Sequence, residues 1–292
     1  MPPAEPDSPL AGSPSTGHRM QCMEIWGGNS SIMDAISSPG IDAWVYSRPH
    51  ENAGQGGDIH YVSMCASGRI ARYFVADVAG HGEAVSELAR RLRTLMRRNI
   101  NTIDQTKFAR ALNEEFSRLE THGRFATAVL ATYYAPTRNL ILCNAGHPRP
   151  MWYRAADRTW SVLDRDARGT VEAASNLPLG IIEPTDYHQF AIELNPGDLV
   201  VFITDGLVEA KDDQGCLLGE AGLLDIARSF DPSSPTALLA GLLERVVQYQ
   251  SGRPIDDDVT VVLLHQNGAP IPTYSLGEYA GAVAKMLGLK RT

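Results

Sequence analysis

The sequence is poor in cysteine, and its cysteines form no pattern. Cys22, Cys65, Cys143 and Cys216 include no C-x-x-C pair and no zinc-finger spacing, which argues against a disulfide framework or a thiolate metal site. Cys65 and Cys143 lie in apolar runs, where a free thiol behaves as a small hydrophobic side chain. This cysteine usage indicates a reducing, cytoplasmic compartment.

Long apolar stretches and excess positive charge are also missing. The longest apolar runs, such as Leu199–Ile203, have only the length of a strand, whereas a membrane-spanning helix needs roughly 20 apolar residues. The N-terminus has no basic segment followed by an apolar one, so we expect no secretory signal. A net charge of −8 argues against a general nucleic-acid binder, because phosphate affinity needs a basic surface. We therefore expect a cytoplasmic protein that binds neither membrane nor nucleic acid.

The composition divides the chain into one large domain and two short ends. Residues 1–22 are rich in proline, serine and glycine, which predicts a disordered tail. Residues 23–268 show no comparable break and are predicted to form a single domain. Residues 269–292 contain apolar residues at helical spacing, which predicts a short C-terminal helix. Packing of this helix on its own domain is the favoured interpretation, and a homodimer or a regulatory contact is the alternative.

Apolar runs rich in β-forming residues come in pairs that are joined by short turns. Since parallel strands need long crossovers, such short connections predict antiparallel pairing. The expected strands are 59–66 with 70–76, 125–134 with 139–143, and 187–194 with 199–204, together with 151–153 and 259–264.

Four segments have the apolar periodicity of amphipathic helices, at about 85–98, 106–119, 220–228 and from Ser234 onward. The first interleaves five arginines with its apolar positions. A solvated helix face is the favoured interpretation of these arginines, and recruitment of an acidic partner or a phosphoprotein is the alternative. Antiparallel sheets whose outer faces are covered by helices are the simplest architecture for these elements, which is an α+β fold.

Aspartates lie at the ends of four of the apolar runs: Asp58, Asp77, Asp205 and Asp257. In isolation Asp205 is typical of a turn and Asp77 of a helix cap. Together they are harder to explain in this way, because an unpaired buried carboxylate costs several kcal/mol. Clustered carboxylates face water, take up protons or hold a cation. Oxygen ligands favour Mg²⁺ or Mn²⁺ over zinc, and two such ions can activate a water for in-line attack on phosphorus.

Seven short motifs follow one another along the chain: G-G-D (56–58), D-V-A-G-H-G (77–82), F-A-T-A (125–128), N-A-G-H-P (144–148), L-P-L-G (177–180), T-D-G (204–206) and D-D-V-T (257–260). This order resembles the PPM, or type 2C, metal-dependent protein phosphatases, and within them the bacterial SpoIIE-like serine phosphatases. The resemblance spans about residues 24–266.

The resemblance implies a four-layer αββα sandwich with a dinuclear Mg²⁺ or Mn²⁺ site at one end of its two antiparallel sheets. Asp77 would bridge both cations, and the backbone carbonyl of Val78 would bind one of them. Asp205 and Asp257 would bind the other cation, and Asp58 would bind directly or through water. Asp77 and Asp205 are the predicted catalytic residues.

The implied activity is hydrolysis of phosphoserine or phosphothreonine in a regulatory protein, such as an anti-sigma-factor antagonist. The alternative is a non-catalytic regulator that keeps the fold and binds a signalling partner, although such a protein would usually have lost one of the aspartates. An enzyme acting on small phosphoesters is a third hypothesis. His81 and His147 fit structural turns better than catalysis, and neither is a predicted site residue.

Overall fold

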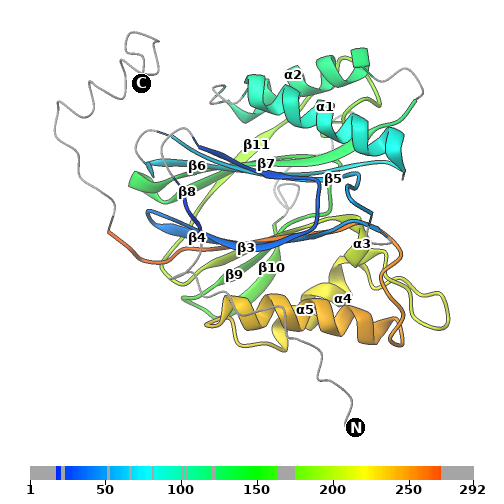
Figure 1. Cartoon of the computed structure of the whole chain (residues 1–292). Helices are drawn as coiled ribbons and strands as arrows, with labels where there is room; N and C mark the ends of the chain where they lie inside the picture. The colour runs from blue at the N-terminus through cyan, green and yellow to red at the C-terminus, as the bar shows by residue number, and fades with distance from the viewer. Residues whose placement is uncertain are drawn as a thin grey trace, which may run out of the picture.

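The computed structural model describes residues 18–20, 24–50, 53–65, 68–80, 82–99, 102, 104–119, 123–163 and 175–270. Two sheets lie face to face in the middle of the molecule, and helices cover the outer face of each (Figure 1). The predicted four-layer αββα sandwich is confirmed.

One sheet has six strands in the described chain, in the order β11-β8-β7-β6-β5-β2, and every neighbouring pair is antiparallel. The hairpins predicted around residues 67–69 and 135–138 form two of these pairs, and a short 3₁₀ turn, Ala135–Thr137, connects the second. The bounds are β2 Ile25–Gly28, β5 Asp58–Cys65, β6 Ile70–Val78, β7 Ala126–Tyr134, β8 Asn139–Ala145 and β11 Gln189–Glu193.

The facing sheet has seven described strands, in the order β1-β3-β4-β13-β12-β9-β10. All of its neighbours are antiparallel except β1 and β3, which are parallel. The bounds are β1 His18–Arg19, β3 Ile32–Ser38, β4 Ile41–Arg48, β9 Met151–Arg154, β10 Thr159–Val162, β12 Leu199–Ile203 and β13 Val259–His265.

The helices divide between the two outer faces, as the sequence predicts. Helices α1 (Glu83–Asn99) and α2 (Gln105–Leu119) cover the six-stranded sheet, where Leu92 and Leu112 join its outer core. Helices α3 (Asp205–Val208), α4 (Gly219–Arg228) and α5 (Pro235–Tyr249) cover the other sheet (Figure 1). The longer helices α1, α2, α4 and α5 turn their apolar stripes toward a sheet and most of their charged residues toward solvent.

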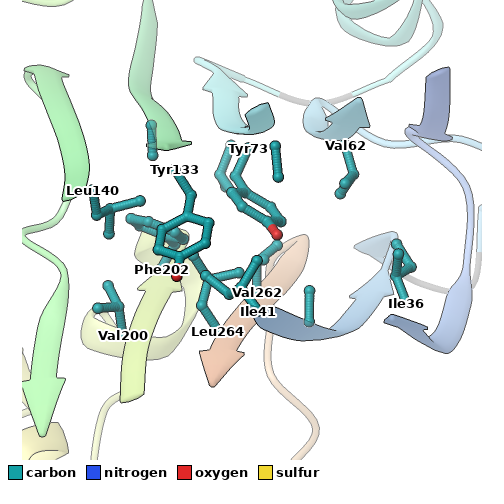
Figure 2. Packing of buried hydrophobic residues seen from close by; sticks show 14 of the residues in the cluster. Ile36, Ile41, Val62, Tyr73, Tyr133, Leu140, Val200, Phe202, Val262 and Leu264 are labelled. Carbon is teal, nitrogen blue, oxygen red and sulfur yellow. The ribbon is translucent and has the colours of Figure 1, made fainter. Parts of the chain in front are cut away.

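The apolar layer between the sheets is the part of the core that leads to the predicted site residues. Tyr73 and Tyr133 of the six-stranded sheet pack against Phe202 and Val262 of the seven-stranded sheet (Figure 2). Alternation along each strand sends every second side chain into this layer. In β6, for example, Tyr73 and Val75 face the layer, so Asp77, two residues farther on, faces it too. The apolar layer therefore ends in a carboxylate.

One predicted hairpin is wrong. Residues 187–194 and 199–204 were expected to pair across Asn195-Pro196-Gly197, but β11 pairs with β8 and β12 pairs with β9 and β13. The short connection crosses between the two sheets instead. Leu194 is buried in the layer between them, and the buried carboxylate of Asp198 accepts the Asn195 and Ala155 N–H groups at 2.9 and 2.8 Å. A connection of this length can join two paired strands of one sheet or two strands in facing sheets. Its length therefore does not show which of the two arrangements the chain adopts.

The ends of the chain differ in part from the prediction. Of the tail predicted over residues 1–22, His18, Arg19 and Met20 are described, and they are not a tail. His18–Arg19 pairs with β3, and Met20 is only 4% exposed because it packs into the central layer. Residues 1–17 and 21–23, and the helix predicted within 269–292 beyond residue 270, lie outside the described residues.

Five strands have no counterpart among the predicted ones: β1, β2, β3, β4 and β10. Polar residues such as Asp34 and Asp42, and the glycines of β2, interrupt their apolar pattern. In the described residues no helix is long and apolar enough to cross a membrane.

The inter-sheet crossing gives a stability prediction. Asp198→Ala removes the acceptor of two backbone N–H groups, and leaving a buried donor unsatisfied costs about 1–3 kcal/mol. We expect the variant to lose at least about 2 kcal/mol of unfolding free energy in urea. Asp225→Ala on the exposed face of α4 is the control and should change little. Equal stability of the two variants would show that Asp198 does not hold the crossing.

Candidate active site

Two of the predicted site residues are direct neighbours in the six-stranded sheet. Asp58 opens β5 and Asp77 lies next to the last residue of β6, and the two are paired in the strand register. Residues directly opposite each other on antiparallel strands have Cβ atoms roughly 5 Å apart. Both side chains face the layer between the sheets, at the end where the apolar residues stop. The backbone pairing alone therefore holds these two carboxylates together.

The other two carboxylates come from the seven-stranded sheet. Asp205 follows β12 and begins α3, and Asp257 precedes β13, which is antiparallel to β12. The end of one strand and the start of the next therefore lie side by side. Asp205 and Asp257 lie within electrostatic reach of Asp77 and of each other. The structure thus brings all four predicted aspartates to the same end of the central layer.

These carboxylates interact unfavourably with one another. Burial, followed by the charges of Asp205 and Asp257, raises the pKa of Asp77 to about 8. Burial and the charge of Asp257 raise the pKa of Asp205 to about 6. The pKa values of Asp58 and Asp257 are also raised, mainly by burial. In the described chain no lysine or arginine forms an ion pair with any of the four.

The three consecutive aspartates before β13 have different environments. The side chain of Asp256 is 94% exposed, and Asp257 faces the cluster. Asp258 is buried and points to the loop before β5, where its carboxylate accepts the N–H groups of His50, Gly57 and Asp58. Asp258 therefore fixes the backbone that carries Asp58. This role could not be predicted from the sequence, because three adjacent aspartates look alike there.

Gly57 permits the close approach of the start of β5 to the end of β6. A Cβ atom on Gly57 would lie 2.8 Å from the Val78 carbonyl oxygen, which is closer than such atoms can pack. Val78 N–H in turn donates to the Gly57 carbonyl at 3.3 Å. The G-G-D motif therefore brings the Val78 backbone beside Asp58 because its second residue lacks a side chain.

The chemistry of the site suits a hard cation. The Asp58 Oδ1 atom is buried and has no hydrogen-bond partner, although buried polar atoms are nearly always satisfied. All candidate ligands are oxygens, which Mg²⁺ and Mn²⁺ prefer. Among the described residues no three His, Cys, Asp or Glu side chains form a ready-made metal-binding group. The fit therefore rests on the donor atoms and on the crowded negative charge, and some side-chain rearrangement would accompany binding.

The structure agrees with a structural role for His147. Its backbone exchanges two hydrogen bonds with the Asn144 side chain, and its Nδ1 lies 2.8 Å from the Thr127 hydroxyl. Burial lowers the pKa of His147 to about 3, so the ring is neutral. Thr127 lies on β7 and is the register partner of Asp77 on β6. The turn around His147 therefore supports the strand next to the one that carries Asp77. His81 lies outside the described residues.

Comparisons with known proteins agree with this geometry. The model of the family described as Stage II sporulation protein E (SpoIIE) matches residues 67–267, more than half of the 292-residue chain. The chain belongs to the SpoIIE family. Phosphoserine phosphatase RsbU of Bacillus subtilis (strain 168) is 26% identical over 208 residues, which are 71% of this chain and 58% of RsbU. The match thus spans less than two thirds of that relative.

Two solved structures of similar proteins show the same fold. The PP2C phosphatase domain of SpoIIE from Bacillus subtilis has a TM-score of 0.65 and 18% identity, covering 86% of this chain and 71% of that one. RsbX in complex with magnesium has a TM-score of 0.58 and 17% identity, covering 80% of this chain and 99% of RsbX. The αββα sandwich of this SpoIIE family member is therefore a PP2C-type fold.

The raised pKa of Asp77 predicts an unusual pH dependence of the metal-free protein. The folded-state pKa of about 8 lies above the unfolded value of 3.8. Stability is therefore lost as the pH rises between these two values, because the unfolded chain releases this proton first, and the loss is complete above about pH 8. Asp77→Asn carries no charge. In EDTA we expect it to be more stable than the wild type at pH 8.5, by on the order of 1 kcal/mol or more, with the difference shrinking toward pH 5.

Urea unfolding at several pH values measures this difference. Asp256→Asn is the matched control, because its side chain is 94% exposed and it should follow the wild type at every pH. A constant difference between Asp77→Asn and the wild type from pH 5 to 8.5 would contradict the crowding of charge at this site.

Proposed function

We propose that this chain is a metal-dependent protein phosphatase that hydrolyses phosphoserine or phosphothreonine. The observation that carries the proposal is the convergence of Asp58, Asp77, Asp205 and Asp257 from two sheets on one end of the central layer. Membership of the SpoIIE family and the similarity to a phosphoserine phosphatase support it.

In this proposal Asp58, Asp77, Asp205 and Asp257, with the Val78 carbonyl, would hold two divalent cations, Mg²⁺ or Mn²⁺. Asp77 would be shared between the two ions, the Val78 carbonyl would serve one, Asp205 and Asp257 would serve the other, and Asp58 would bind directly or through water. Such ions supply Lewis acidity, which neutralises phosphate charge and makes water nucleophilic near neutral pH. The known magnesium complex of RsbX, which has the same fold, supports the choice of cation. Asp77 and Asp205 are the proposed catalytic residues, and Asp77 lies within electrostatic reach of Asp58, Asp205 and Asp257.

An open pocket of about 750 Å³ lies beside the loop that leads into Asp58 and has room for a phosphorylated side chain. Its walls are residues 53–57, the start of α1 and Asp258. A phosphorylated side chain on the surface of another protein could enter this pocket with little of its own backbone buried. We propose a phosphorylated regulatory protein as substrate, with an anti-sigma-factor antagonist as the specific candidate.

The proposal predicts strict metal dependence. Hydrolysis of a phosphoserine peptide, or of para-nitrophenyl phosphate, should require added Mn²⁺ or Mg²⁺ and be lost in EDTA. Asp77→Asn should lower the rate by on the order of 100-fold or more, because metal-ion stabilisation of the transition state is worth several kcal/mol. Phosphate release at a normal rate from fully metal-stripped enzyme would refute the proposal, and a wild type inactive with every metal would favour the non-catalytic alternative.

The three aspartates before β13 allow a matched comparison. Asp257→Asn should weaken metal-dependent turnover by at least about 10-fold, whereas Asp256→Asn should stay close to the wild type, since its side chain is 94% exposed. Asp258→Asn should also reduce turnover, but with a lower melting temperature, because an amide oxygen cannot accept all the N–H groups that the carboxylate holds. Turnover and melting temperature measured together separate the two roles, and similar losses in all three variants would show that the metal ligand is misassigned.

A further inference from the structure

A chain of buried hydroxyl groups joins the two sheets behind Asp58. The Thr204 hydroxyl donates to Asp58 Oδ2 at 2.7 Å, and both side chains are almost completely buried. Asp58 belongs to the six-stranded sheet, and Thr204 follows β12 of the seven-stranded sheet. This hydrogen bond therefore links the two halves of the carboxylate cluster directly, through a residue that is not itself a candidate ligand.

The direction of this hydrogen bond is fixed by the neighbouring backbone. Thr204 Oγ1 accepts the N–H of Thr260 at 2.8 Å, and its single proton remains to be donated. The other acceptor within reach is the Thr260 carbonyl at 3.4 Å, which is a longer and weaker contact than the one to Asp58. The hydroxyl proton therefore points at the Asp58 carboxylate.

The chain continues across the seven-stranded sheet. The Thr260 hydroxyl lies 2.9 Å from the Ser47 hydroxyl, and these two residues are register partners on β13 and β4. Thr204 N–H also donates to the Thr260 carbonyl at 3.0 Å. Thr260 is fully buried and Ser47 nearly so. Thr204, Thr260 and Ser47 therefore lie in one row across the sheet, and the Thr260 backbone, which bonds both the N–H and the hydroxyl of Thr204, limits how far Thr204 can move.

We propose that Thr204 is a positioning residue for Asp58, backed by Thr260 and Ser47, and that it turns this carboxylate so that Oδ1 is free for a divalent cation. The structure leaves Oδ1 without a hydrogen-bond partner, while Oδ2 is held by Thr204. The cation itself rests on the proposed function. The positioning role goes beyond it, because it assigns to the threonine of the T-D-G motif a task distinct from that of its aspartate.

Steric packing alone does not explain this threonine. Valine has nearly the same shape, but it would leave Asp58 Oδ2 and the Thr260 N–H without their partner in a buried place, which is costly. Asp58 would then be free to turn away from the cluster. Serine keeps the hydroxyl and loses only a methyl group, so it should preserve the positioning.

The test compares Thr204→Val, Thr204→Ser and a control, Thr132→Val, in the full-length chain. Thr132 is also a buried threonine with a hydrogen-bonded hydroxyl, which accepts from Gln105 Nε2 at 2.6 Å. It lies five residues along β7 from Thr127, the register partner of Asp77, a separation of roughly 17 Å along the strand. The control therefore carries the same chemical change far from the carboxylates.

Mn²⁺ binding to the chelator-treated protein is measured by calorimetry, and the rate is measured against Mn²⁺ concentration. We expect Thr204→Val to weaken Mn²⁺ binding by about 10- to 100-fold, which is the usual effect of losing a group that orients a ligand. The Mn²⁺ concentration for half-maximal rate should rise in parallel. Thr204→Ser should bind like the wild type, and Thr132→Val should do so even if it melts at a lower temperature.

The outcomes separate this inference from the proposed function. Wild-type Mn²⁺ affinity in Thr204→Val, or a failure of Thr204→Ser to restore binding, would overturn the positioning role while leaving the phosphatase proposal intact. Equal weakening in Thr204→Val and Thr132→Val would also overturn it, since loss of any buried hydroxyl would then suffice. Absence of Mn²⁺ binding and of activity in the wild type would overturn the proposed function and this inference with it.

Discussion

Four carboxylates crowd together at the end of an apolar layer, and the rest of the structure has to accommodate their mutual repulsion. Asp58 and Asp77 are brought there by strand pairing, and Asp205 and Asp257 by the adjoining ends of β12 and β13. Each added negative charge raises the free energy of the others. A fold that depended on stability alone would not place them so close. The arrangement is maintained because hydrogen bonds from residues outside the four carboxylates fix the surrounding backbone.

Those residues hold the backbone around Asp58 and its Oδ2 atom, and they leave its Oδ1 atom without a hydrogen-bond partner. Asp258 holds the loop before β5 through three N–H groups, and Gly57 allows the Val78 backbone to come close. Thr204 holds Asp58 from the opposite sheet. Buried polar networks of this kind are stable only when nearly every member is satisfied. The unsatisfied Asp58 Oδ1 atom is thus an exception at the place where a ligand is expected.

Much of this fold and site could be predicted from sequence, and the failures have a common cause. The hairpin of β5 and β6 follows from two apolar runs and a short turn, so the pairing of Asp58 with Asp77 follows nearly from the sequence. The crossing after Leu194 does not, because a short turn does not reveal whether the next strand joins the same sheet or the facing one. The hydrogen bonds of Ser47 and Thr260 could not be predicted either, since hydroxyl residues are common in strands and their partners depend on how the sheets face each other. Local sequence patterns predict individual strands and helices, whereas the contacts between the two sheets depend on how the whole chain folds.

The division of the cluster between two sheets has a consequence for how the site can respond to change. Asp58 and Asp77 are fixed relative to each other by backbone hydrogen bonds, but their distance from Asp205 and Asp257 depends on how the sheets pack. The apolar side chains between the sheets, such as Phe202 and Tyr133, resist compression because protein interiors are densely packed. The chain of hydroxyl groups behind Asp58 adds a directional link that apolar packing lacks. A cation bound by residues of both sheets would join them more tightly, so metal affinity and the stability of the sandwich should be thermodynamically coupled. A substitution in the central layer, far from any ligand, can therefore change metal affinity by shifting one sheet against the other.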